Sequence, residues 1–98
     1  MKHFLVKLIP PRSTFPQDMS EEEKKLMQQH AAYWQGLLGE GKVIVYGPVS
    51  DPKGAYGMGV LRVENEEEAR SLMAGDPTCK AGLNTVEIYP MTAVTKQK

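Results

Sequence analysis

One histidine of this sequence occupies a position from which it could transfer protons. His30 lies three residues after Met27 and four before Trp34, which places it on the apolar stripe of an amphipathic helix. Its side chain is therefore expected to point toward the protein interior. Histidine titrates near neutral pH and commonly serves as a general base or general acid. The other interpretation is a histidine at the edge of the core with one satisfied hydrogen bond.

An aspartate far along the chain is the second candidate for chemistry. Asp76 precedes Pro77 at the end of a predicted second helix, and Asp-Pro is common where a helix stops or a turn begins. A functional role requires its carboxylate to lie near His30, where it would hold the imidazole in one tautomer. Two helices on one sheet face would allow that proximity, but the spacing alone leaves both interpretations open.

The remaining candidates carry weaker signals. Arg12 stands in a proline-rich segment and is expected either to be solvated or to meet an anionic substrate if that segment folds over the sheet edge. Trp34 shares the apolar stripe with His30 and is expected to contact the substrate. Cys79 has no neighbouring histidine in the sequence and is interpreted as an inert thiol. Because His3, His30 and Cys79 lack metal-ligand spacing, neither a metal nor another cofactor is expected.

Two glycine patterns resemble nucleotide-binding motifs. Gly36–Lys42 has the glycine and lysine spacing of a phosphate-binding loop, but Val43 replaces the required Ser or Thr. The segment also runs from a helix into a strand, so no helix N-terminus is available to meet a phosphate. Gly54, Gly57 and Gly59 lie in a predicted hairpin, where turn geometry and sheet twist, or the close approach of a ligand or partner, explain them. Nucleotide binding is not expected.

The composition is that of an ordinary globular chain. Its 98 residues are 41% hydrophobic and 24% charged, with twelve basic and twelve acidic side chains, which suits one domain with one modest core. A net charge of zero argues against nucleic acid as a partner. No apolar run reaches the ~20 residues of a membrane span. One cysteine excludes an intrachain disulfide, and without a signal-peptide pattern a cytoplasmic location is expected.

The elements that must position these side chains follow the order β-α-β-β-α-β. The predicted strands are Lys2–Ile9, Lys42–Val49, Ala55–Glu64 and Asn84–Met91. Pro10–Met19 holds three prolines and is predicted as a loop. A single domain over residues 1–98 accounts for all of these elements, with Thr92–Lys98 as a polar tail.

Helix starts are marked by capping residues. Ser20 and Glu23 form a predicted capping box, from which a helix of about five turns runs to Gly39. Asn65 caps a shorter helix that ends at about Ala74. Thr78–Gly82 is expected to form one helical turn.

In one small domain, this element order predicts an α+β, ferredoxin-like fold, in which a four-stranded antiparallel sheet carries two helices on one face. Both faces of the strands look apolar. The alternating sets are Phe4, Val6 and Leu8 against Leu5 and Ile9, and Val43 and Val45 against Ile44 and Tyr46. Because two helices cover only one face, the bare face is expected to pack against a second copy of the chain and form a homodimer.

Several short motifs, in order, resemble the YciI-like (YCII-related) family. They are His30, Glu40–Val43, Gly47-Pro48, Asp76-Pro77 followed after two residues by Lys80–Leu83, and a strand ending at Pro90. The resemblance spans about residues 30 to 90 and implies a ferredoxin-like subunit of a dimeric α/β barrel. It also implies an active-site histidine and aspartate at His30 and Asp76. The chain differs from the pattern at Met27–Gln29 and in its long first loop, which leaves the substrate open.

Two functions are consistent with these residues. The first is a cofactor-independent small-molecule enzyme of isomerase, lyase or hydrolase type, in which His30 moves a proton and Asp76 orients it. Arg12 and Trp34 would contact a small polar or cyclic organic acid in a cleft between helices and sheet. The alternative is a non-catalytic dimeric module that binds a small ligand or acts in regulation, where His30 only shapes the pocket. The histidine on the buried stripe favours the enzyme.

Overall fold

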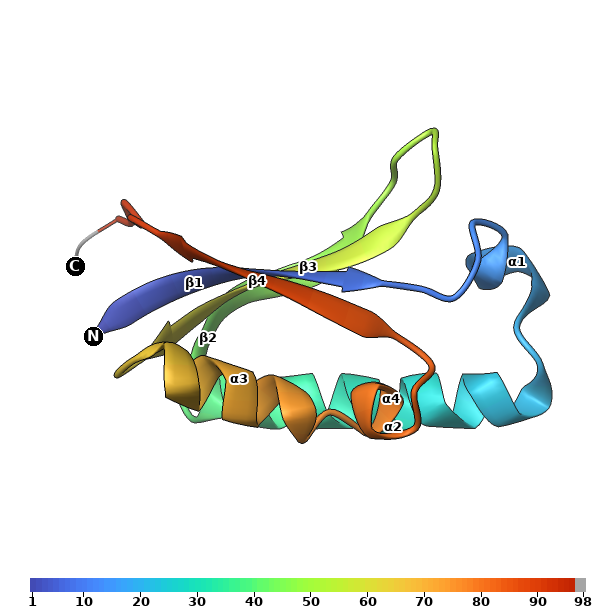
Figure 1. Cartoon of the computed structure of the whole chain (residues 1–98), viewed down its shortest axis with the longest axis horizontal. Coiled ribbons are helices and arrows are strands. Elements are labelled where there is room, and N and C mark those ends of the chain that lie inside the picture. Colours follow the sequence, from blue (N-terminus) through green and yellow to red (C-terminus); the bar gives the residue numbers. More distant parts are fainter. Residues whose placement is uncertain (97–98) are drawn as a thin grey trace.

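Four strands rich in apolar residues form one antiparallel sheet, covered by helices on one face (Figure 1). The computed structural model describes residues 1–96, and the last two residues of the predicted polar tail lie outside this range. The elements are β1 (Lys2–Ile9), α1 (Phe15–Asp18), α2 (Glu21–Gly39), β2 (Val43–Val49), β3 (Tyr56–Val63), α3 (Glu66–Ala74), α4 (Pro77–Lys80) and β4 (Thr85–Met91). The strand order β2-β3-β1-β4 confirms the predicted ferredoxin-like α+β fold.

Both long helices begin at the capping residues that the sequence predicts. The Ser20 hydroxyl accepts a hydrogen bond from the Glu23 amide at 3.1 Å, and the Glu23 carboxylate accepts one from the Ser20 amide at 2.9 Å. At α3, the Asn65 side chain accepts from the Glu68 amide at 2.8 Å. Glu68 itself accepts from the Glu64 amide rather than from Asn65. The caps therefore set where each helix starts.

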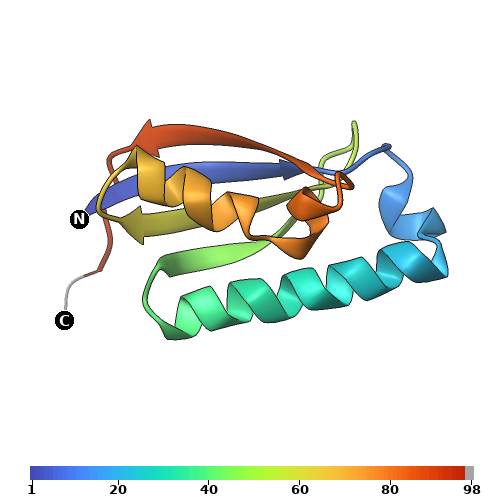
Figure 2. The same cartoon turned by 60° about the horizontal axis from the view of Figure 1, so that its bottom comes forward.

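The two long helices lie side by side on the same face of the sheet (Figure 2). Tyr33 of α2 ties them together, because its hydroxyl donates to the Leu72 carbonyl of α3 at 2.6 Å. The core lies between helices and sheet and consists of Phe4, Val6, Trp34, Leu37, Val43, Leu61, Val63, Ala69 and Met73. The helix layer thus holds α2 and the segment after α3 against the same strands.

The prediction of a continuous loop over Pro10–Met19 is wrong in its second half. Phe15–Asp18 forms the single-turn helix α1, in which Pro16 is tolerated because the first turn needs no amide donor. Phe15 is buried. Arg12 fastens this turn, since its guanidinium pairs with Asp18 and with Glu23 of α2, at 2.8 Å each, and lies over the Phe15 ring. The segment is an ordered cap at one end of the sheet.

The predicted alternation along β2 is also wrong, because the strand contains a β-bulge. Val43 pairs with Leu61 and Val45 pairs with Val60, so Ile44 is an extra residue in the ladder. Val43 and Tyr46 therefore both face the helices and join the core, whereas Ile44 and Val45 are exposed. The bulge turns Tyr46 toward Trp34, where the ring centroids are 5.6 Å apart.

Gly59 of β3 provides the space that Trp34 occupies. A Cβ at this position would lie 2.4 Å from Trp34 Cζ3, so Gly59→Ala forces the indole or the strand to move. We expect a loss of about 1–3 kcal/mol in the free energy of unfolding, measured by urea denaturation. Gly47→Ala is the matched control, because a Cβ there meets no described atom within 4 Å. Equal stability of the two variants would contradict this account.

Candidate active site

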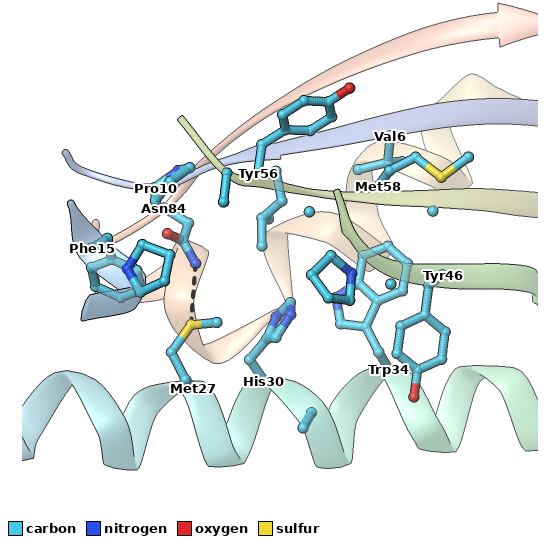
Figure 3. Close-up of a pocket in the computed structure, with 18 of the residues that line it drawn as sticks. Val6, Pro10, Phe15, Met27, His30, Trp34, Tyr46, Tyr56, Met58 and Asn84 are labelled. Carbon is cyan, nitrogen blue, oxygen red and sulfur yellow. Dashed lines mark hydrogen bonds between the residues drawn. The ribbon is translucent and has the colours of Figure 1, made fainter. Parts of the chain in front are cut away.

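A cavity of about 350 Å³ lies between the sheet and the N-terminal half of α2. Its walls come from β1, β2 and β3 above, from α2 below, and from α1 at the end. The lining is almost entirely apolar. The polar exceptions that reach toward its interior are His30 and Asn84, as the close-up shows (Figure 3). A small molecule with an apolar body and few polar groups fits such a space.

The structure brings His30 and Asp76 together across 46 positions of the sequence. His30 Nδ1 lies 2.6 Å from Asp76 Oδ2, a distance typical of a charge-assisted hydrogen bond. Because the carboxylate can only accept, the imidazole donates from Nδ1. This hydrogen bond fixes the tautomer and leaves Nε2 as the basic nitrogen of the neutral ring. Among residues 1–96, the hydrogen bonds of this ring involve Nδ1 only, so Nε2 is free for a ligand.

Asp76 is fully buried, and four hydrogen bonds compensate its charge. Oδ2 accepts from His30 and from the Trp34 indole at 2.7 Å. Oδ1 accepts from both the amide and the hydroxyl of Thr78, each at 2.7 Å. Burial alone raises the pKa of Asp76, but the hydrogen bonds from His30, Thr78 and Trp34 outweigh it and hold the pKa at about 2. The carboxylate is therefore an anion at neutral pH.

Both sequence interpretations of Asp76 describe part of its role. As the N-cap of α4, it satisfies the amide of Thr78 through one oxygen. Through the other oxygen it holds His30 and Trp34. Trp34, which was expected to contact the substrate, lines the cavity and also orients the carboxylate. The ring of Trp34 is tilted against the imidazole with centroids 6.0 Å apart, so the indole supports His30 from one side.

The structure places Arg12 and Cys79 outside this arrangement. The Arg12 guanidinium, which was expected either to be solvated or to meet an anionic substrate, pairs with Asp18 and Glu23 and anchors α1. Its contact with a substrate stays a prediction. Burial raises the pKa of the Cys79 thiol to about 11, and the nearby Asp76 charge adds to this. A thiol with so little thiolate at neutral pH is a poor nucleophile, which agrees with the sequence interpretation.

Comparison with known proteins identifies the family. The model of the YCII-related domain matches residues 1–92. The chain belongs to the YCII-related family. The resemblance predicted from the motifs between His30 and Pro90 is thereby confirmed. No curated protein matches the sequence.

Solved structures similar to this YCII-related chain share its fold. One is 5-chloro-2-hydroxyhydroquinone dehydrochlorinase (TftG) from Burkholderia phenoliruptrix AC1100, in complex with 2,5-dihydroxybenzoquinone, with 21% identity, a TM-score of 0.70 and coverage of 92% of this chain and 93% of that one. Another is the uncharacterized protein TM1266 from Thermotoga maritima, with 11% identity, a TM-score of 0.52 and coverage of 92% and 95%. At these identities, the comparisons establish the architecture of the YCII-related chain alone.

Two polar residues of the site were missed by sequence reasoning. Thr78 supplies two of the four hydrogen bonds to Asp76, and Asp76-Pro77-Thr78 could have been recognised as an N-cap followed by Pro at the first helical position. Asn84 lines the cavity, but in the sequence it reads only as the residue before a strand.

The part of the chain that the structure describes contains neither a cluster of metal-ligating side chains nor a helix that could span a membrane. Within residues 1–96, no group of three or more His, Cys, Asp or Glu side chains is arranged to hold a metal ion. None of the helices in that range is long and apolar enough to cross a membrane.

Asp76 should stabilise the protein in a pH-dependent way. Its pKa falls from 3.8 to about 2 on folding, so its ionised form contributes about 2 kcal/mol above pH ~4, and this contribution disappears as the pH falls toward ~2. We expect Asp76→Asn to lose stability at pH 7 and to approach the wild type in acid, as measured by urea unfolding across this range. Asp51→Asn, in the β2–β3 hairpin, is the control. A difference that does not change with pH would refute the argument.

Proposed function

We propose that this protein is a cofactor-independent enzyme that transfers a proton on a small molecule, with His30 as the general base and general acid. The observation that carries the proposal is the 2.6 Å hydrogen bond between His30 Nδ1 and Asp76 Oδ2 beside a cavity that His30 lines. An imidazole held in one tautomer presents its basic Nε2 without further reorganisation. Asp76 is a positioning residue, because it acts through His30.

The reaction begins when Nε2 takes a proton from the bound substrate. The imidazolium that forms is stabilised by the Asp76 carboxylate, which stays ionised because its pKa is about 2. In an isomerisation, His30 returns the proton to another atom of the substrate. In an elimination, the electron pair of the broken bond expels a leaving group as an anion, and His30 later loses the proton to water. Both routes balance without a redox cofactor.

Isomerase or lyase chemistry is favoured over hydrolysis through a covalent intermediate. None of the described residues that line the cavity is Ser, Thr, Cys or Lys. The described wall of the cavity therefore lacks the side chains that most often form a covalent intermediate. A dehydrochlorinase with the same fold, bound to 2,5-dihydroxybenzoquinone, supports a small cyclic substrate. The largely apolar walls formed by Phe15, Met27 and Trp34 suit the body of such a ring.

The bare face of the sheet supports a homodimer as part of this proposal. Leu5 and Val60 lie at its centre, as cross-strand partners of β1 and β3. Val45 and Tyr89, on the outer strands, are exposed at 51% and 48%. All four side chains are apolar or aromatic and share the face opposite the helices. Val60 is already buried in the single chain, and packing two such faces together would bury Leu5, Val45 and Tyr89 as well, as in the dimeric α/β barrel that the family resemblance implies.

Replacing His30 tests the catalytic role. We expect His30→Gln to lower kcat/KM by about 10²–10⁴ on any halogenated or hydroxylated cyclic acid or phenol that the wild type converts in a metabolite panel. His3→Gln, which removes the other histidine of the chain from the opposite sheet face, should retain activity. Full activity of His30→Gln would refute the role of His30. Binding of panel members without turnover by the wild type would favour the alternative, a ligand-binding module.

A charge on the bare sheet face tests the dimer. We expect the wild type to sediment as a dimer and Val45→Glu to sediment as a monomer, because a carboxylate would have to be buried at the interface. Leu38→Glu is the matched control, since Leu38 is another exposed apolar residue but lies on α2, away from the sheet face. A monomeric wild type in analytical ultracentrifugation would overturn the dimer.

A further inference from the structure

We infer that Asn84 is a ligand-binding residue, whose side-chain carbonyl accepts a hydrogen bond from a hydroxyl of the substrate. The inference rests on the proposed function, because the ligand must occupy the cavity that His30 also lines. It deepens that proposal by naming the class of ligand: a small, largely apolar ring or short chain with two polar groups, one for Asn84 and one for His30.

The first observation is an unsatisfied buried polar atom. Asn84 is 4% exposed, and its Oδ1 has no hydrogen-bond partner among residues 1–96. Its Nδ2 makes one weak contact, to Met27 Sδ at 3.7 Å. Burial of an amide oxygen without a donor destabilises a folded protein, and most buried polar groups in proteins are paired. A group of this kind at the wall of a cavity marks where a ligand can supply the missing donor.

The amide has no evident structural task in this position. The N-cap of α4 is Asp76, and β4 begins only at Thr85. The described residues with a positive φ are all glycines, so Asn84 has a negative φ. Its backbone conformation is therefore one that other residue types adopt equally well. A leucine of similar size would fill the space without leaving an unpaired oxygen. The residue type is thus unexplained by folding alone.

The position of Asn84 relative to His30 sets the spacing of the ligand's polar groups. The amide projects from the segment before β4 toward Met27, and His30 projects from α2 next to it (Figure 3). Met27 precedes His30 by three residues, which is roughly 4–5 Å along a helix axis. The Asn84 amide therefore contacts α2 at Met27, and the imidazole of His30 projects from α2 three residues further along the helix. The walls on either side of these two residues are apolar, with Phe15 at the end near Asn84 and Trp34 beyond His30 (Figure 3).

Asp76, which holds His30, and Asn84, which faces the cavity, lie on one short segment of the chain. Asp76 caps α4. The backbone N–H of Asn84 donates to the backbone carbonyl of Thr78 at 3.2 Å, so the turn that follows α4 folds back on the first residues of that helix. Thr78 thereby connects the carboxylate that holds His30 with the residue that faces the ligand. The proton-transfer group and the second polar contact are positioned by the same short loop.

Asn84→Leu separates a ligand-binding role from a structural one, because the two roles predict opposite changes in stability. Removing an unpaired buried oxygen should raise the Tm of the free protein by a few °C. The same change should weaken binding of hydroquinone, a flat ring with hydroxyls at opposite ends, by about tenfold or more. Phenol, with one hydroxyl for His30, should lose little. The measurements are thermal unfolding and calorimetric titration with hydroquinone kept reduced.

Asn84→Ala and Thr85→Val complete the set. The alanine variant should show the same loss of preference for hydroquinone over phenol, which keeps the test valid if leucine does not fit. Thr85→Val, at the exposed next residue, should keep the preference. A fall in Tm on Asn84→Leu that Asn84→Ala shares, an unchanged preference in both, or no binding of hydroquinone by the wild type would each overturn the inference. Binding needs no turnover, so these results are independent of whether His30→Gln retains activity.

Discussion

The buried carboxylate of Asp76 is the constraint on which the site depends. An ion in a protein interior is costly unless every lone pair is engaged, and here four donors from α2 and α4 engage it. Those donors can meet at one point only if α2, the end of α3 and the turn of α4 keep their mutual positions. The charge therefore couples the packing of three helical elements to the orientation of one imidazole.

Trp34 shows how this coupling reaches the sheet. Its indole N–H is committed to Asp76, so the ring cannot rotate to relieve a clash. The strand beneath it must then be free of a side chain, and Gly59 meets that need. On its other side, the ring packs on Tyr46, which the bulge at Ile44 has turned inward. The hydrogen bond that fixes Trp34 thus connects the carboxylate to Gly59 on β3 and to Tyr46 on β2.

The sequence predicts the fold well because the fold follows from local signals. The capping residues Ser20 and Asn65 mark helix starts, and the alternation in β1 marks its faces. The errors occur where a non-local contact decides. The bulge at Ile44 reverses the faces of one strand only because β3 pairs with it in a shifted register. The turn of α1 is held by Arg12 reaching Glu23 eleven residues away. Neither contact has a signature in its own segment.

In the candidate site, too, local spacing predicts some features, whereas non-local contacts decide the others. The position of His30 on its helix face follows from spacing, but its distance to Asp76 depends on how α2 packs against α4. The cap pattern at Asp76-Pro77-Thr78 could indicate the backbone contact of Thr78, but its hydroxyl contact with the buried carboxylate and the place of Asn84 in the cavity wall require the three-dimensional structure.

The α1 cap has a consequence for how such a protein can diversify. Phe15, Pro16 and Met19 close one end of the cavity. The segment that carries them is held by the ion pairs of Arg12 and by the burial of Phe15, which lies outside the main core cluster. The His30–Asp76 pair and the shape of the cavity mouth therefore belong to separable stretches of chain. Insertions or substitutions between residues 10 and 19 can change which molecules enter while the imidazole and its carboxylate stay as they are. Selection can thus change the shape of the cavity mouth in this segment without disturbing the hydrogen bond between His30 and Asp76.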